Sequence, residues 1–164
     1  MIRLATAADA AALAALWNPW ITDTAITFAA TTKTPDDLAL MIATRPAFFV
    51  SLSHDPGDQG PSLHGFATYN QFRNGDGYAT CMEHTIILAP AAGNKGHGRA
   101  LLTAVEAHAA VHGAHQMIAG ISAENPAGLA FHAAMGYAEI ARIRDAGYKF
   151  DRFIDLVFMQ KFLT

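Results

Sequence analysis

Residues 93–98 read GNKGHG, and an alanine-rich stretch, RALLTAVEAHAAVHG, follows directly. Glycine is the poorest helix former after proline, so glycines gathered at the start of a helix indicate that the backbone approaches another group closely. The N–H groups and the dipole of a helix N-terminus attract anions, phosphate in particular. The segment therefore suggests a phosphate-binding turn, although a merely flexible turn would have the same composition.

Two common nucleotide-binding motifs do not fit this turn. A P-loop requires Gly-x-x-x-x-Gly-Lys-Ser/Thr. Gly93 and Gly98 have the right separation, but Arg99 and Ala100 stand where Lys and Ser or Thr belong. A dinucleotide fingerprint requires a third glycine, and Leu101 occupies that position. Neither motif therefore explains the glycines.

Glu83 lies within the mostly apolar segment CMEHTIIL, shortly before the turn. A partly desolvated carboxyl group has a raised pKa, which suits a general base. The same side chain could instead pair with Arg or Lys, or face solvent. In a strand Cys81 would share the face of Glu83, but no base motif adjoins it to make it a nucleophile. His84 would point to the opposite face, as a packing or interface residue.

Three histidines, His108, His112 and His115, lie on or just after the expected helix that follows the turn. Histidines four residues apart on a helix can share a zinc ion. No His-Glu-x-x-His arrangement is present, and Gly113 ends the helix before His115. We therefore favour a solvated helix face over a metal site.

The elements that must position these residues follow from apolar periodicity and from capping residues. Thr34 before Pro35 is the strongest helix start, and Gly136 is a helix C-cap. Turns are expected at 54–62 and 73–77. Strands are expected at 1–6, 47–53, 63–72, 78–88, 115–122, 137–147 and 153–163, and helices at about 7–20, 35–45, 96–112 and 126–135. This order predicts a mixed α/β fold: a mostly antiparallel sheet of about seven strands flanked by about four helices, with one parallel step across 96–112.

The composition predicts a soluble cytoplasmic protein with one domain, residues 1–164. The 164 residues suffice for one sizeable core, and 52% hydrophobic against 15% charged residues argues against disorder. A net charge of −3 gives no reason to expect nucleic acid or an anionic membrane surface as partner. No segment approaches the ~18 consecutive apolar residues of a membrane helix, and the first residues have no secretory pattern. The single cysteine fits a reducing compartment.

Several segments together resemble the GNAT superfamily of N-acetyltransferases, and within it the phosphinothricin and methionine-sulfone acetyltransferase branch. The resemblance spans nearly the whole chain, and the matching segments are NPWITDTAITF, GFATYNQFR, MEHTIIL, AGISAENPAGLAFHAAMGY and GYKFDRFIDLVFMQ. The glycine turn resembles the acyl-coenzyme A loop of this family, Gln/Arg-x-x-Gly-x-Gly/Ala, with Gly93 in place of Gln or Arg. The resemblance implies the GNAT acyl-CoA N-acyltransferase fold.

The resemblance also implies an acetyl-CoA site without a metal. In the family, the strand that carries Glu83 separates from the strand at 115–122, and the V-shaped gap holds the pantetheine arm. The implied coenzyme-binding residues are Thr85, Ile86, Ile87, Leu88, Asn94, Lys95, Gly96, His97, Gly98, Arg99, Asn125 and His132.

Three residues near the short helix at 126–135 carry more than one interpretation. Asn125 is a helix N-cap that, by resemblance, also contacts the coenzyme, while Gly128 replaces the usual serine. His132 stands where many relatives place a tyrosine that protonates the departing thiolate; it could equally be a half-buried helix histidine. Tyr137 is either a core aromatic or a wall of the binding site.

For the acceptor, the resemblance implies Arg73, whose guanidinium could bind the carboxylate of an amino acid through two N–H groups. A solvent-facing turn arginine is the alternative. Phe28 and Tyr137 would complete the acceptor site, with Glu83 as general base and His132 as acid.

The resemblance implies an acetyl-CoA-dependent N-acetyltransferase acting on the primary amine of a small amino-acid-like acceptor. The acceptor would be of the phosphinothricin, methionine sulfone or methionine sulfoximine type. Gly93 and Gly128 favour an alternative, a degenerate module that binds CoA or an amino acid without turnover. A protein N-terminal acetyltransferase is a third possibility, against which the aromatic-rich loop at 17–28 suggests a closed pocket. Family members are commonly dimers, so we expect a homodimer, although the apolar terminal strand would also suit a monomer.

Overall fold

The computed structural model describes residues 1–53 and 62–163, and it contains seven strands and four α-helices. The elements in chain order are β1 (Ile2–Leu4), α1 (Ala10–Asp23), α2 (Pro35–Thr44), β2 (Ala47–Ser53), β3 (Ser62–Gln71), β4 (Cys81–Leu88), α3 (His97–Val111), β5 (Gln116–Ser122), α4 (Pro126–Ala134), β6 (Ala138–Lys149) and β7 (Arg152–Phe162). The predicted mixed fold is confirmed. Apart from Ser62, which begins β3, the turn expected at 54–62 lies outside the described residues.

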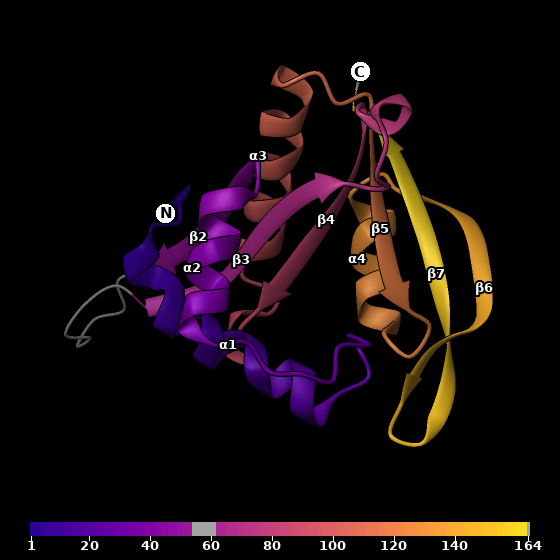
Figure 1. Cartoon of the computed structure of the whole chain (residues 1–164), viewed down its shortest axis with the longest axis horizontal. Coiled ribbons are helices and arrows are strands. Elements are labelled where there is room, and N and C mark those ends of the chain that lie inside the picture. Colours follow the sequence, from indigo (N-terminus) through magenta and orange to yellow (C-terminus); the bar gives the residue numbers. More distant parts are fainter. Residues whose placement is uncertain (54–61, 164) are drawn as a thin grey trace.

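The strands form one sheet in the order β1-β2-β3-β4-β5-β7-β6. All neighbours are antiparallel except β4 and β5, which confirms the predicted parallel step across α3. The β4–β5 pairing covers only Cys81–Glu83 against Gln116–Ile118, and Figure 1 shows the two strands diverging beyond it. The separation that the family resemblance implied is therefore present.

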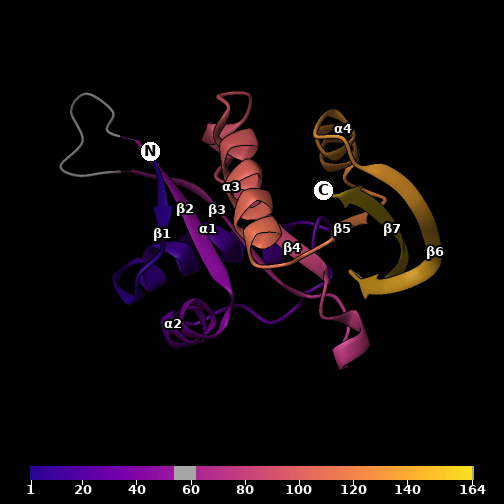
Figure 2. The same ribbon diagram turned by 90° about the horizontal axis from the view of Figure 1, so that it is seen from above.

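Two hydrophobic cores lie on the two faces of the sheet. One contains the inward side of α3, with Leu101, Leu102 and Val105 fully buried against β3, β5 and β7. The other joins α1 and α2 to β2 and β3 through residues such as Leu13 and Phe66. In Figure 2, α3 and α2 lie on opposite sides of the strands. Side chains that alternate along β4 therefore face different helices.

Capping residues set the helix boundaries largely as predicted. The Thr34 hydroxyl accepts a hydrogen bond from the Asp37 amide at 3.1 Å, and the Asp37 carboxylate accepts one from the Thr34 amide at 2.8 Å. Gly96 precedes α3 with φ of +83°, a conformation that glycine adopts without strain. The α1 boundary was predicted wrongly, because the helix continues through Pro19 to Asp23. In the described part of the chain, no helix is long and apolar enough to cross a membrane.

The start of β4 also differs from the prediction. Residues 76–78 form a 3-10 turn, and the strand begins at Cys81 rather than at Tyr78. Gly75, with φ of +113°, precedes this turn and breaks the extended backbone. At the other end of the sheet, β6 runs on to Lys149, past the predicted end at 147.

We predict that Gly65→Ala lowers the free energy of unfolding by about 1–3 kcal/mol, because it overpacks the β3–β4 contact. A Cβ at this position would lie 2.6 Å from the Ile87 carbonyl oxygen, which is backbone and must shift. Denaturant unfolding measures the change. Gly77→Ala is the matched control, since a Cβ there meets no atom within 4 Å. Equal stabilities of the two variants would contradict the packing argument.

Candidate active site

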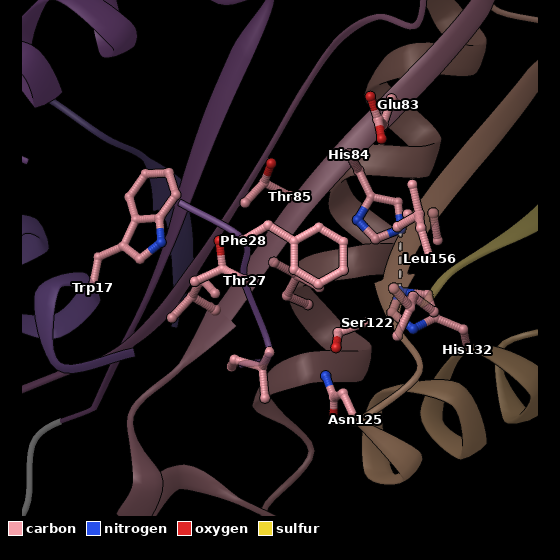
Figure 3. Close-up of a pocket in the computed structure, with 16 residues that line it drawn as sticks. Trp17, Thr27, Phe28, Glu83, His84, Thr85, Ser122, Asn125, His132 and Leu156 are labelled. Carbon is pink, nitrogen blue, oxygen red and sulfur yellow. Dashed lines mark hydrogen bonds between the residues drawn. The ribbon is translucent and has the colours of Figure 1, made fainter. Parts of the chain in front are cut away.

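A cavity of about 240 Å³ lies where β4 and β5 separate (Figure 3). Residues of α1 and the loop after it, of β4, β5, β7 and α4, form its wall. Because these elements come from both sides of the sheet, the cavity reaches both faces through the gap. Its polar lining side chains are Thr27, Glu83, His84, Thr85, Ser122, Asn125 and His132.

Glu83 occupies the last position at which β4 pairs with β5, opposite Ile118. A Cβ at Gly120 would lie 3.0 Å from Glu83 Oε1, so glycine leaves room for the carboxylate. Burial raises the pKa of the Glu83 carboxyl above its usual value, and the positive charge of Arg45, just after α2, opposes this rise. The cavity therefore holds a carboxyl group that is more basic than a free glutamate, which suits a general base.

On the other face of β4, His84 and His132 form a buried pair. Their Nε2 atoms are 3.2 Å apart, and the two ring planes lie within 20° of each other. His132 Nδ1 is 2.7 Å from the Gly128 carbonyl oxygen, within α4. Burial, together with the neighbouring His132, lowers the pKa of His84 to about 3, and burial also lowers the pKa of His132. His84 faces away from Glu83 as predicted, and its contact with His132 was not foreseen.

The loop between α1 and α2 closes the cavity opposite α4, and Phe28 lies on its wall. Lys149 Nζ, at the end of β6, donates a hydrogen bond to the Thr27 carbonyl oxygen at 2.8 Å. The Phe28 ring packs on the backbone of Gly147, where a Cβ would lie 2.5 Å from ring carbon Cδ2. The β6–β7 hairpin therefore holds the loop that carries Phe28.

A second hollow, of about 320 Å³, lies at the N-terminus of α3. Its lining includes Asn94, Gly96, Gly98 and Arg99, together with Leu88 at the end of β4. Because Glu83–Ile87 line the first cavity, β4 leads directly from one hollow to the other. Of the other residues implied for this site, Lys95 is exposed, and His97 Nδ1 is hydrogen-bonded with Ser51 Oγ at 2.8 Å. Neither Lys95 nor His97 is among the lining residues of the hollow.

Asn125 combines the two roles considered for it. Its side-chain oxygen accepts a hydrogen bond from the Gly128 amide at 2.9 Å, as an N-cap does, and the residue also lines the cavity. A Cβ at position 128 would overlap the Asn125 side chain. Gly128 therefore gives Asn125 the space to fold over the first turn of α4.

Two predicted acceptor residues are not at the cavity. Tyr137 is buried in the core with its ring against His84 and His132, which is the first of its two predicted roles, and it is not among the residues that line the cavity. An aromatic residue after a helix cap can lie in the core or at the wall of a site. Here the Tyr137 side chain packs between α4 and β4, in the core. Arg73 is exposed on the loop after β3, with its guanidinium 5.4 Å from the Tyr78 ring centroid.

The surroundings of Cys81 and of the histidines on α3 bear on two alternative roles raised by the sequence, a nucleophilic thiol and a metal site. Burial and the nearby Glu83 raise the pKa of the Cys81 thiol, which disfavours the nucleophilic thiolate. His108 Nδ1 is hydrogen-bonded with the Tyr69 hydroxyl at 2.8 Å, and its ring stacks on that of His112. Within residues 1–53 and 62–163, no three His, Cys, Asp or Glu side chains are grouped as a metal ion would require.

Arg45 and Gly120 are two of the site residues that sequence reasoning missed. Arg45 directly follows α2 in a stretch that gives no motif, and it acts on Glu83 although the two are far apart in the sequence. Gly120 sits inside an ordinary apolar strand, AGIS. A glycine within a strand often marks a place where another group approaches the backbone closely. The position of Gly120 within the strand was therefore the one signal in the sequence that could have identified it.

Comparison with known proteins agrees with this geometry. Residues 2–158 match the family model described as acetyltransferase (GNAT) domain. The chain is 33% identical to the L-amino acid N-acyltransferase MnaT of Escherichia coli (strain K12), covering 97% of this chain and 91% of that protein. It is 32% identical to an L-methionine sulfoximine/L-methionine sulfone acetyltransferase of Salmonella typhimurium, covering 97% and 92%.

Among solved structures, a GNAT superfamily phosphinothricin acetyltransferase from Sinorhizobium meliloti, in complex with AcCoA, superposes with a TM-score of 0.89. It is 29% identical, and the match covers 99% of this chain and 87% of that one. The family model, the two relatives and the superposition cover nearly the same residues, including both hollows. The chain therefore belongs to the GNAT family of acetyltransferases.

Proposed function

We propose that this protein transfers the acetyl group of acetyl-CoA directly to the primary amine of a small amino-acid-like acceptor. The observation that carries the proposal is the Glu83 carboxyl, raised in pKa at a cavity that reaches both faces of the sheet. The names of the relatives support the acceptor class, which comprises amino acids, methionine sulfone, methionine sulfoximine and phosphinothricin.

Acetyl-CoA is a substrate in this reaction, and residues of β4 and α3 fit it. The N-terminus of α3 offers N–H groups and a positive dipole end to the diphosphate, with Gly96 and Gly98 allowing its approach. Beyond Glu83, the edge of β4 that faces β5 has no partner among the described strands. Backbone groups of Thr85 to Ile87 can therefore bond the amides of an extended pantetheine arm.

Residues on different faces of β4 handle the first and the last proton transfer of the reaction. Glu83 accepts a proton from the acceptor ammonium, and the freed nitrogen lone pair forms a bond to the thioester carbonyl carbon. The C–S bond breaks, the nitrogen loses its second proton, and the departing thiolate gains one. We assign this last proton to the histidine side, where His132 and His84 lie against α4. Glu83 finally releases its proton to solvent.

The acceptor enters from the side of α1 in this proposal. Phe28 and Thr27 line the cavity there, and Trp17 extends the same wall. We retain Arg73 as a proposed contact for the acceptor carboxylate. Arg73 lies three residues after Asn70, and Asn70 is the residue of β3 that pairs with Glu83 of β4.

The β6–β7 hairpin supports a proposed homodimer. Ile140, Ile143, Tyr148, Phe150 and Phe153 are 45–65% exposed there, at the edge of the sheet. Side chains of this kind gain stability when a second copy covers them. We further propose a cytoplasmic location and one domain, residues 1–164, since a single cysteine fits a reducing compartment and all described strands join one sheet.

The proposed function is tested by thermal shift with acetyl-CoA, followed by thiol release with a panel of amines. The panel contains amino acids, methionine sulfone, methionine sulfoximine, phosphinothricin and a peptide with a free N-terminus. We expect stabilisation by acetyl-CoA and release of CoA thiol with at least one small acceptor. Stabilisation without release for any amine would support the binding module, which the bare Gly93 favours, and release with the peptide alone would support an N-terminal acetyltransferase.

We predict that Glu83→Gln lowers kcat at neutral pH by about 100-fold or more, because the amide cannot accept the ammonium proton. The Kd for acetyl-CoA should stay close to that of the wild type. Steady-state kinetics and calorimetry measure the two quantities. Glu139→Gln, on the exposed strand β6, serves as the control. Unchanged turnover in Glu83→Gln would remove Glu83 as the base.

Arg45→Met should move the acid limb of the kcat–pH profile to higher pH. Arg45 stabilises the ionised form of Glu83, so its removal raises the pKa of that carboxyl, and the base then becomes protonated at a higher pH. Arg144→Met, an exposed residue of β6, controls for the loss of one positive charge. An acid limb that stays in place, or that moves down, would contradict the assigned contact.

Gly93→Arg is expected to tighten acetyl-CoA binding by up to about fivefold, as an exposed charge pair does. Position 93 has φ of −59°, and a Cβ there would lie 3.8 Å from the Pro90 carbonyl oxygen, so a side chain fits. Calorimetric titration gives the Kd, with Gly93→Ala as the uncharged control. Equal Kd values for the two variants would show that no diphosphate lies within reach of residue 93.

A further inference from the structure

Hydrogen-bond partners determine where the protons of the His84–His132 pair reside. His132 Nδ1 faces the Gly128 carbonyl oxygen at 2.7 Å, and that oxygen can only accept, so Nδ1 carries a hydrogen. In neutral His132, Nε2 then bears the lone pair. The facing His84 Nε2, 3.2 Å away, must therefore be the donor. It follows that His84 Nδ1 carries no hydrogen and presents a lone pair.

His84 Nδ1 is buried and has no hydrogen-bond partner among the described residues. His84 as a whole is only 7% exposed and lines the cavity beside Thr85. In Figure 3 its Nε2 is joined to His132 by the dashed line, which leaves the other ring nitrogen off this contact. A buried acceptor without a partner costs stability unless a ligand satisfies it. Both nitrogens of His132, by contrast, already have partners.

Burial lowers the pKa of His132, but the Gly128 carbonyl and the charge of Glu106 oppose this effect and can stabilise a transient positive charge on the ring. Glu106 of α3 acts on His132 through its negative charge, and it also faces Tyr137. Glu106 is paired with Lys161 at 2.6 Å, and Glu83 lies on the other side of β4. Among the described residues, Lys161 is the one positive group that forms an ion pair with Glu106. A proton on His132 would thus meet the Gly128 carbonyl and the Glu106 carboxylate.

We infer that His84 Nδ1, and not a nitrogen of His132, is the acid–base group that touches the reacting atoms, with His132 as its positioning partner. His84 Nδ1 takes the second proton from the amine nitrogen after the C–N bond has formed. The His84 Nε2 proton moves at the same time to His132 Nε2. When the C–S bond breaks, both shifts reverse, and His84 Nδ1 gives its proton to the thiolate sulfur.

This exchange balances, because the proton lost by nitrogen is the one gained by sulfur. Nitrogen and sulfur are bonded to the same carbon before the C–S bond breaks, so one imidazole nitrogen can serve both. The inference rests on the proposed acetyl transfer and assigns a step within it. It also changes the expectation for His132, which then acts through His84.

The kinetic test uses His84→Gln. The glutamine amide can still donate to His132 Nε2, but it places no nitrogen at the Nδ1 position. We expect kcat to fall by about 100-fold or more, with the KM values for acetyl-CoA and the amine near those of the wild type. His112→Gln, an exposed histidine of the same protein, is the control and should leave kcat unchanged. If His84 only holds His132 in place, His84→Gln keeps its activity, and the inference fails.

A measurement on the wild-type protein covers the case in which His84→Gln does not fold. Two-bond ¹H–¹⁵N correlation spectra of histidine-labelled protein report the tautomer of each ring. We expect the Nδ1–H form for His132 and the Nε2–H form for His84. The opposite tautomers would put the free lone pair on His132 and overturn the inference.

The outcomes separate this inference from the proposed function. If the wild type releases no thiol with any amine, the proposed acetyl transfer fails. If the wild type turns over and His84→Gln does so equally well, acetyl transfer stands and only the role of His84 is refuted.

Discussion

The short parallel pairing between β4 and β5 is the constraint on which the rest of the site depends. After Glu83 the two strands part, while β5 remains bonded to β7 along its full length, from Gln116 to Ser122. The sheet therefore keeps its integrity on both sides of an opening that passes through it. Unpaired backbone groups of a strand normally cost stability, and here they line a cavity where a bound chain can satisfy them.

Strand alternation then sorts the chemistry of the site by face. Glu83 and Thr85 point toward α1 and α2, where the charge of Arg45 keeps the carboxyl ionisable despite burial. His84 points toward α3 and α4, where burial and the second imidazole favour neutral rings. Glu83, which acts as an anion, and His84, which acts as a neutral ring, are thus adjacent in the chain but are surrounded by different groups on the two faces of β4. The gap between the strands is what brings both to one cavity.

Local patterns in the sequence predicted most elements of the fold. Thr34 and Pro35 mark the start of α2, Gly136 closes α4, and alternation places Glu83 and His84 on opposite faces. These features depend on a few neighbouring residues. The end of α1 was placed near Trp20, but the helix continues to Asp23, with Ile21 buried in the core and the extended backbone of Thr24 ending it.

The site was less predictable where it depends on tertiary contacts. Arg45 reaches Glu83, and His132 reaches His84, only because the sheet order brings distant segments together. Tyr137 fits a core or a wall equally well from its sequence, and packing between α4 and β4 decides for the core. Residue chemistry and the family resemblance both pointed to Glu83 and the glycine turn, but neither indicated Arg45 or the contact between His84 and His132.

A crystal structure with acetyl-CoA tests the central claim most directly, namely that the opening between β4 and β5 is the acyl-donor site. The account predicts the diphosphate at the N-terminus of α3, beside Gly96 and Gly98. It also predicts the pantetheine arm between the two strands, with the thioester at the cavity that Glu83 and His84 share. Acetyl-CoA bound elsewhere on the molecule, with this opening left unfilled, would contradict the account.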